Sequence, residues 1–79
     1  MDLDFRNASK VVGIKQSRRA VIDGLATQVI LARDADPQVT GPIEALCAEK
    51  GVPTRWENSM KALGQACGVD VGAAAVALL

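Results

Sequence analysis

The sequence predicts an α/β fold, a three-layer α-β-α sandwich with a central four-stranded mixed sheet. Apolar runs of strand length alternate with segments of helical periodicity, and the links between them are short and rich in Gly, Pro or Asp. The chain has 79 residues, of which 49% are hydrophobic, mostly aliphatic. We therefore expect a single domain over residues 1–79 with a dense aliphatic core.

The first half of the chain is expected to contain two helices and two strands. A short helix is predicted over residues 2–9 and a brief strand over residues 10–13. The next helix begins after Gly13 and ends where Gly24 adopts a left-handed conformation. Its inward face is predicted to comprise Ile14, Val21, Ile22 and Leu25. Residues 28–32, in which four apolar residues follow Gln28, predict a strand covered on both faces.

A third helix is predicted to have a proline in its first turn. Thr40 or Gly41 can cap it, and Pro42 suits its first turn. Its inward stripe is predicted to be Ile43, Leu46 and Cys47. We expect Gly51 to end this helix.

The last third of the chain predicts a strand, a short helix and another strand. Residues 52–56 are predicted to form the first strand. Because Pro53 lacks an N–H, either this strand lies at an edge of the sheet or the proline lies among the first residues of the strand. Ser59 is expected to cap the start of the short helix, and Gly68 is expected to end it. Residues 74–79 then form a buried strand.

The sequence contains no assembled catalytic or metal site. Asp34 and Asp36 are close together, but aspartate before proline also closes a strand and opens a helix, and no histidine exists in the chain. Cys47 and Cys67 stand apart, which argues against a disulfide or zinc and fits a reducing compartment. Phosphate-binding glycine motifs are absent. We therefore expect a non-enzymatic protein without a cofactor.

The termini give no sign of membrane targeting. The acidic N-terminal residues lack the apolar run of a signal peptide, and the longest apolar stretch, residues 71–79, is too short to cross a bilayer. We expect a cytoplasmic monomer.

Charge is distributed unevenly along a chain whose net charge is zero. The residues between Phe5 and Arg19 contain five bases and no acid, which leaves four bases against nine acids elsewhere. The bases are Arg6, Lys10, Lys15, Arg18 and Arg19. Such a cluster can be a solvated helix face, or it can be the place where a phosphate backbone docks.

The start of the helix after Gly13 concentrates the polar side chains. Lys15, Gln16, Arg18 and Arg19 lie in its first turns. A helix N-terminus favours anions, and Arg, Lys and Gln can hydrogen-bond to base edges. The chain has only Phe5 and Trp56 as aromatic residues, and we expect both in the core. An RNA partner would then be a shaped, partly duplex target rather than a single strand stacked on rings.

Four segments together resemble a known family. They are Val-Val-Gly-Ile-Lys-Gln-Ser-Arg-Arg-Ala-Val-Ile-Asp-Gly, Val-Ile-Leu-Ala-Arg-Asp-Ala-Asp-Pro, Ser-Met-Lys-Ala-Leu-Gly and Cys-Gly-Val-Asp-Val-Gly-Ala-Ala-Ala-Val-Ala-Leu. Their order and spacing resemble the kink-turn RNA-binding ribosomal protein superfamily, in particular its small bacterial YbxF-type branch. The resemblance covers nearly the whole chain and implies an α-β-α sandwich that binds kink-turns. These are sharply bent RNA elements with a bulge beside tandem sheared G·A pairs.

The resemblance also implies which residues contact the RNA. Gly13 would allow close backbone approach, Lys15 and Gln16 would stand at the Asn and Glu/Gln positions of the family's motif, and Arg19 would replace a basic residue that contacts the same stem. The loop before the last strand would pack on bulged nucleotides. The complete predicted set is Gly13, Lys15, Gln16, Arg18, Arg19, Met60, Lys61, Val69, Asp70, Val71, Gly72 and Ala73.

Three positions depart from the family pattern. Lys15 replaces an amide by a cation, Met60 stands where archaeal relatives tend to have Lys, and Gly72 replaces a proline, which would leave the loop less rigid.

Two alternatives remain open. One is a protein-interaction module on the same fold with an acidic docking surface, and the other is a small DNA-binding domain, although no second helix precedes the basic one at helix-turn-helix spacing.

Overall fold

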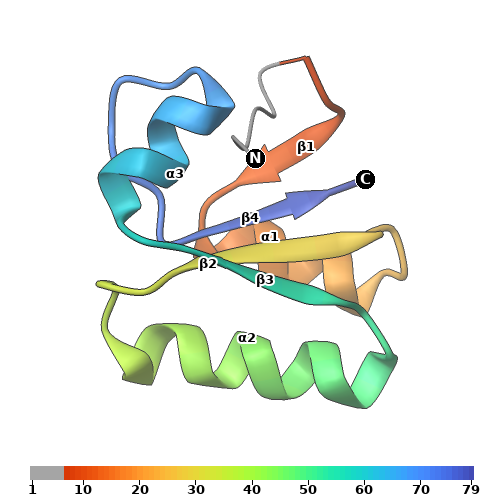
Figure 1. Ribbon diagram of the computed structural model, residues 1–79. Helices are drawn as coiled ribbons and strands as arrows, with labels where there is room; N and C mark the ends of the chain where they lie inside the picture. Colours follow the sequence, from red (N-terminus) through yellow and green to blue (C-terminus); the bar gives the residue numbers. More distant parts are fainter. Residues whose placement is uncertain (1–6) are drawn as a thin grey trace.

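A computed structural model describes residues 7–79 of the chain. Helices and strands alternate along these residues (Figure 1). In chain order they are β1 (Lys10–Val12), α1 (Ile14–Ile22), β2 (Gln28–Ala32), α2 (Pro37–Lys50), β3 (Thr54–Glu57), α3 (Met60–Cys67) and β4 (Ala75–Leu78). The predicted alternation is confirmed over this part of the chain.

The strands form one mixed sheet in the order β1-β4-β2-β3. β4 pairs antiparallel with β1 and with β2, and β2 pairs parallel with β3. In this register Val76 of β4 lies between Val12 of β1 and Ile30 of β2. The C-terminal ends of β1, β2 and β3 therefore meet the N-terminal end of β4 at one end of the sheet, on the left in Figure 1. We call this the strand-exit end.

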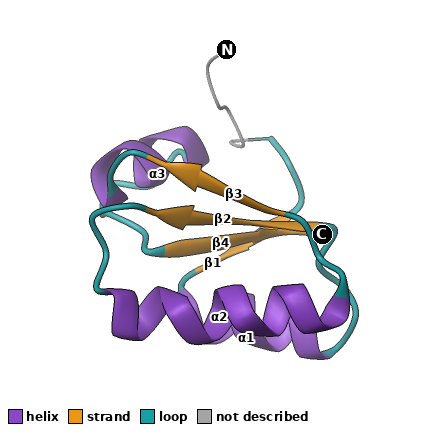
Figure 2. Ribbon diagram, turned by 60° about the horizontal axis from the view of Figure 1, so that its bottom comes forward, coloured by secondary structure: helices purple, strands orange, loops and turns teal. Residues whose placement is uncertain are grey.

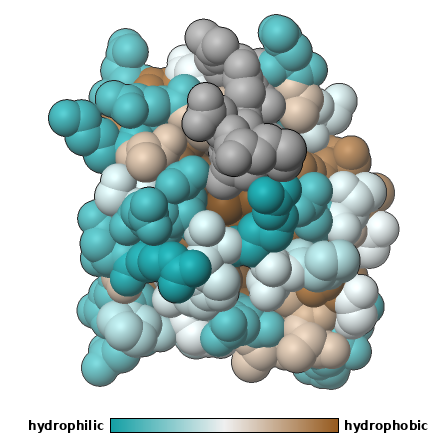
Figure 3. All heavy atoms as spheres, viewed as in Figure 1, coloured by the Kyte–Doolittle hydropathy of each residue, from teal (hydrophilic) through white to brown (hydrophobic). Residues whose placement is uncertain are grey.

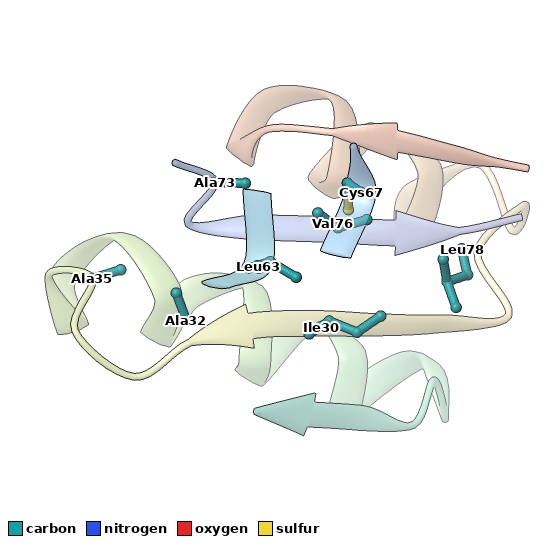
Figure 4. Packing of buried hydrophobic residues seen from close by; sticks show 8 residues of the cluster. All are labelled: Ile30, Ala32, Ala35, Leu63, Cys67, Ala73, Val76 and Leu78. Atoms are coloured by element: carbon teal, nitrogen blue, oxygen red, sulfur yellow. The ribbon is translucent and has the colours of Figure 1, made fainter. Parts of the chain in front are cut away.

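Helices cover both faces of the sheet, with α1 and α2 on one face and α3 on the other (Figure 2). The core accordingly has two clusters. The cluster beneath α3 contains Ile30, Ala32, Ala35, Leu63, Cys67, Ala73, Val76 and Leu78 (Figure 4). The cluster beneath α1 and α2 contains Ala20, Val21, Val29, Leu31, Ile43, Cys47, Ala75 and Ala77. The predicted three-layer sandwich with a four-stranded mixed sheet is confirmed.

Each core cluster holds one of the two cysteines, and both are buried free thiols. Burial is the main cause that raises the pKa of Cys47 and of Cys67 above its usual value. Because the thiolate is the reactive form, both side chains act as small apolar packing residues.

The helix α1 buries Val21 as predicted, but not Ile22. Its buried residues are Ser17, Ala20 and Val21. These positions repeat at three and four residues and define one side of the helix, and Ile14 packs partly against the same cluster. Ile22 lies about 100° further around the axis and is 45% exposed, and Leu25 follows the helix and is 60% exposed. The inward prediction is wrong for Ile22 and Leu25, while the left-handed Gly24, with φ 72°, is confirmed.

The helix α2 begins at Pro37 because Asp36 caps it. The Asp36 carboxylate accepts a hydrogen bond from the Gln38 N–H at 2.9 Å, and Pro37 occupies the first helical position. The first N–H groups of a helix have no intrahelical acceptor. Asp36 supplies an acceptor for one of them, and Pro37 has no N–H that needs one.

The predicted start of this helix at Thr40 or Gly41 is therefore wrong. Both residues lie inside α2, and Pro42 lies in its interior as well. A residue suited to a helix start precedes a proline twice in this stretch, before Pro37 and before Pro42. Asp36, whose carboxylate accepts from the Gln38 N–H, is the residue that starts the helix, and the helix continues past Pro42 with one backbone hydrogen bond fewer.

Strand β3 lies at an edge of the sheet, as Pro53 predicted. It begins at Thr54 rather than at Val52. The Val52 N–H donates to the carbonyl of Cys47 at 2.8 Å, so this residue still belongs to the end of α2. Trp56 was expected in the core; it is half-buried and packs against the cluster beneath α1 and α2.

The predicted helix over residues 2–9 and the predicted core position of Phe5 lie wholly or mainly outside the described residues. Residues 7–9 form a turn that leads into β1. Within residues 7–79, no helix is both long and apolar enough to cross a membrane.

Replacing Asp36 tests the observed start of α2. We expect Asp36→Ala to lower the free energy of unfolding by about 1 kcal/mol, because the Gln38 N–H loses its side-chain acceptor. Asp36→Asn keeps an acceptor and should retain most of the stability. Urea unfolding followed by circular dichroism measures both. Equal stability of the wild type and Asp36→Ala would contradict this assignment of the cap.

Candidate functional site

Gly13 joins the edge strand β1 to α1 at the strand-exit end. Its φ of 115° and ψ of 160° lie in a region that is essentially reserved for glycine. Its N–H donates to the carbonyl of Ala75 at 2.9 Å, and its own carbonyl accepts from the Ser17 N–H at 2.9 Å. One residue thus extends the pairing with β4 and begins the helix, which places the helix N-terminus beside the start of β4.

The N-terminus of α1 is electropositive. The first N–H groups of a helix have no intrahelical acceptor, Gly13 supplies no side-chain cap, and the first turn contains no acid. Lys15 in this turn is exposed. The partial charge of the helix end and the ammonium group act together, so this turn favours an anionic ligand.

Gln16 lies over the backbone of Gly13. A Cβ atom added to Gly13 would come within 2.9 Å of Gln16 Oε1, so the absence of a side chain at Gly13 leaves room for this amide. Gln16 is exposed at the third position of the helix. An amide at this point can both donate and accept hydrogen bonds.

Arg18 and Arg19 are exposed on α1 beyond the first turn. Arg19 Nε donates to Asp23 Oδ2 at 3.0 Å, in an ion pair one turn apart along the helix. The side chains in this pair are 76% and 39% exposed, so solvent screens the attraction and Arg19 can exchange this partner for another anion.

An open groove of about 550 Å³ runs along this side of α1. Lys15, Arg18 and Arg19 line it together with apolar residues. Its apolar part includes the exposed side chains of Ile22, Leu25 and Leu79. The side chains whose burial was predicted incorrectly therefore form part of the surface next to the basic residues.

The loop after α3 returns along the helix to the strand-exit end (Figure 1). The predicted helix end at Gly68 is confirmed by its φ of 76°. The predicted buried strand over residues 74–79 is shorter than expected, because β4 covers Ala75–Leu78 and Leu79 is 43% exposed. Val71 is 72% exposed, and Asp70 and Gly72 are exposed as well.

Two of the predicted contact residues in this loop are not exposed. Val69 is half-buried and packs against the cluster beneath α3, and Ala73 is buried within that cluster. Their side chains support the loop, and the surface available to a ligand comes from residues 70–72. In Figure 3 the visible side is mostly hydrophilic, with apolar residues in separate patches.

The start of α3 lies at the same end of the sheet. Ser59 Oγ accepts from the Ala62 N–H at 3.0 Å, which confirms the predicted cap. Met60 is 37% exposed and Lys61 is exposed. The N–H of Met60 donates to Asp34 Oδ1 at 2.8 Å.

The two aspartates near the end of β2 are helix caps. Asp34 accepts from the start of α3, and Asp36 accepts from the start of α2. Residues 7–79 contain no group of three or more His, Cys, Asp or Glu side chains that could hold a metal ion. The contacts of Asp34 and Asp36 therefore support a role at helix starts rather than in a metal or catalytic site.

The structure brings the two predicted surfaces together. The Gly13 to Ala75 hydrogen bond joins the start of α1, with Lys15 and Gln16, to the end of the loop. Met60 and Lys61 begin the helix along which the loop returns, whereas Arg18 and Arg19 extend the basic surface along α1.

Sequence reasoning did not single out Arg33, which also lies at the strand-exit end. Its backbone N–H donates to the carbonyl of Glu57 at 2.9 Å, and its guanidinium lies 6.0 Å from the centre of the Trp56 ring. A basic residue directly after a buried strand was the signal that could have identified it.

Comparison with known proteins gives close relatives over most of the chain. It is 49% identical over 69 residues to the RNA-binding protein YbxF of Geobacillus stearothermophilus, covering 87% of this chain and 84% of that protein. It is 46% identical over 68 residues to the RNA-binding protein BH0128 of Halalkalibacterium halodurans, covering 86% and 83%.

Solved structures share the fold. The Giardia lamblia 15.5kD RNA binding protein superposes with a TM-score of 0.83 at 34% identity, over 89% of this chain and 59% of that chain. A protein of unknown function from Bacillus halodurans superposes with a TM-score of 0.82 at 24% identity, over 89% and 70%, which shows the fold alone. The sequence pattern of the ribosomal protein L7Ae/L30e/S12e/Gadd45 family matches residues 6–79. This chain belongs to the ribosomal protein L7Ae/L30e/S12e/Gadd45 family.

Proposed function

We propose that this protein binds structured RNA at the strand-exit end and that its target is a kink-turn. Family membership and the names of the YbxF and BH0128 relatives support RNA as the ligand class. The observation that carries the proposal is the Gly13 to Ala75 hydrogen bond, because it joins an electropositive helix start to the end of the loop that exposes Val71.

The helix start addresses the sheared G·A pairs. Gln16 can donate to and accept from base edges, and Lys15 can donate to guanine O6 and N7 or to a phosphate. Gly13 has no side chain of its own, so only the amide of Gln16 lies between its backbone and the RNA. Arg18 adds charge along α1 for the backbone of the same stem, and Arg19 contacts the guanines or the backbone of that stem.

The loop addresses the bulge. Val71 is the most exposed large apolar residue among those described, at 72%, and it offers an aliphatic surface to an unstacked base. Apolar contact with a base and hydrogen bonds to the G·A pairs require the RNA to be bent. The protein therefore favours the kinked form because it has a higher affinity for that form than for the extended one.

Two substitutions in α1 test the base contacts. We expect Gln16→Ala and Arg19→Ala each to weaken binding to a kink-turn RNA by about 1–3 kcal/mol. Asp23→Ala is the control for Arg19, because it removes the ion pair but keeps the guanidinium and should bind at least as tightly as the wild type. Gel-shift titration measures all three. Unchanged affinity of both Gln16→Ala and Arg19→Ala would exclude this helix as the reading surface.

The RNA can be varied against the same protein. A kink-turn whose sheared G·A pairs are replaced by Watson–Crick pairs should bind far more weakly than the parent RNA, because neither the widened groove nor the bend is then present. Equal affinity for the two RNAs would show that the protein does not recognise kink-turns.

The dependence of affinity on salt separates phosphate contacts from base contacts. Arg18→Ala should lower the slope of log affinity against log salt by about one unit, whereas Gln16→Ala should leave the slope unchanged. Lys50→Ala removes the same charge at the C-terminal end of α2, away from the strand-exit end, and serves as the control. A wild-type affinity that does not change with salt would favour the protein-interaction alternative.

A further inference from the structure

The loop between α3 and β4 has no regular structure of its own, and α3 holds it along one side. The Ala73 N–H donates to the carbonyl of Met60 at 3.0 Å, and the Val69 N–H donates to the carbonyl of Gly64 at 3.0 Å. The second bond belongs to the backbone cap that ends α3, because Val69 directly follows the left-handed Gly68. The loop is thus bonded to the C-terminal end of α3 where it begins and to the carbonyl of Met60 where it ends.

Between these two bonds the loop backbone lies directly against Gly64. A Cβ atom at this position would overlap the carbonyl oxygen of Val71, and it would come within 3.1 Å of the Val71 carbonyl carbon and 3.3 Å of Gly72 Cα. These obstacles are backbone atoms, which cannot move aside as the end of a flexible side chain can. The position of Val71 therefore requires glycine at residue 64.

The helix is itself fixed relative to the sheet. The N–H of Met60 donates to Asp34 Oδ1 at 2.8 Å, and Asp34 lies in the turn after β2. Leu63 is fully buried in the cluster beneath α3. A chain of contacts therefore runs from the sheet through α3 to Gly64 and from there to the exposed loop residue.

We infer that Gly64 is a positioning residue, which sets the place and direction of Val71 by letting the loop backbone rest on α3. The inference depends on the proposed function, since it concerns the contact between Val71 and a bulged base. Gly72 also lies against α3, because a Cβ added there would come within 3.1 Å of Met60 Cβ. Gly64 affects RNA affinity without contacting the RNA.

The chain contains a matched control. Gly41 is also a helix-interior glycine, but a Cβ added there meets nothing within 4 Å. Gly41→Ala should bind RNA like the wild type, because the new methyl group occupies open space and alanine favours a helix. Gly64→Ala introduces the same methyl group against the Val71 carbonyl.

The test is a double-mutant cycle between protein and RNA. We expect Gly64→Ala to weaken binding to an intact kink-turn about tenfold, the loss typical of one base contact, and to have little effect on the same RNA with an abasic bulge. Gly41→Ala should change neither affinity. The slope of affinity against salt should remain that of the wild type, because no phosphate contact is removed.

The outcomes separate this inference from the proposed function. If Gln16→Ala loses affinity but Gly64→Ala binds like the wild type, the positioning role is wrong and the RNA site stands. If Gly64→Ala loses equal affinity for the intact and the abasic RNA, its effect is merely structural and the inference is also overturned. If the wild type binds neither RNA, the proposed function fails, and this inference fails with it.

A second variant covers the case in which Gly64→Ala does not fold. Asp34→Ala removes the acceptor that holds Met60 at the start of α3 but leaves the loop sequence unchanged. We expect a smaller loss that is again confined to the RNA with an intact bulge, and Asp34→Asn, which keeps an acceptor, should restore binding. An equal loss on both RNAs would overturn the role of α3 in placing the loop.

Discussion

The backbone hydrogen bond from the Gly13 N–H to the Ala75 carbonyl fixes the geometry on which the site depends. It continues the pairing of Val12 with Val76 by one residue, at the point where the chain leaves the sheet and enters α1. Because Gly13 has a positive φ and no side chain, the chain can pair with β4 and start a helix within a single residue. The helix start and the loop before β4 are neighbours because of the sheet, so their proximity does not depend on side-chain contacts.

The sequence predicts an element well when a capping residue, a glycine or an apolar run marks its ends clearly. The boundaries of α3 follow from Ser59 and Gly68, and β2 follows from its continuous apolar run. The start of α2 was mistaken because two prolines offered alternative first turns, and the local hydrogen bond from the Gln38 N–H identifies Asp36 as the cap. For α1 the number of apolar residues exceeds what one face can bury, and Ile22 is left outside.

The candidate site was predictable in composition but not in arrangement. The basic residues of α1 and the apolar loop residues can be identified from the sequence, whereas their proximity depends on β4 lying between β1 and β2, and strand order is not encoded in periodicity. The role of Gly64 was equally hidden. The sequence does not show what surrounds Gly64 or Gly41, and only the structure shows that a side chain would meet a backbone at one and open space at the other.

The central place of β4 also determines when the site can form. Val12 and Val76 are separated by most of the chain, so their pairing closes a long loop whose entropy must be lost before the contact contributes stability. The surface around Gly13 and Ala75 consequently exists only once β1 and β4 have paired. A ligand bound there binds the native state and not the unfolded one, and by mass action it stabilises the entire chain rather than one helix. A fragment lacking residues 75–79 would carry the basic residues without a framework to orient them.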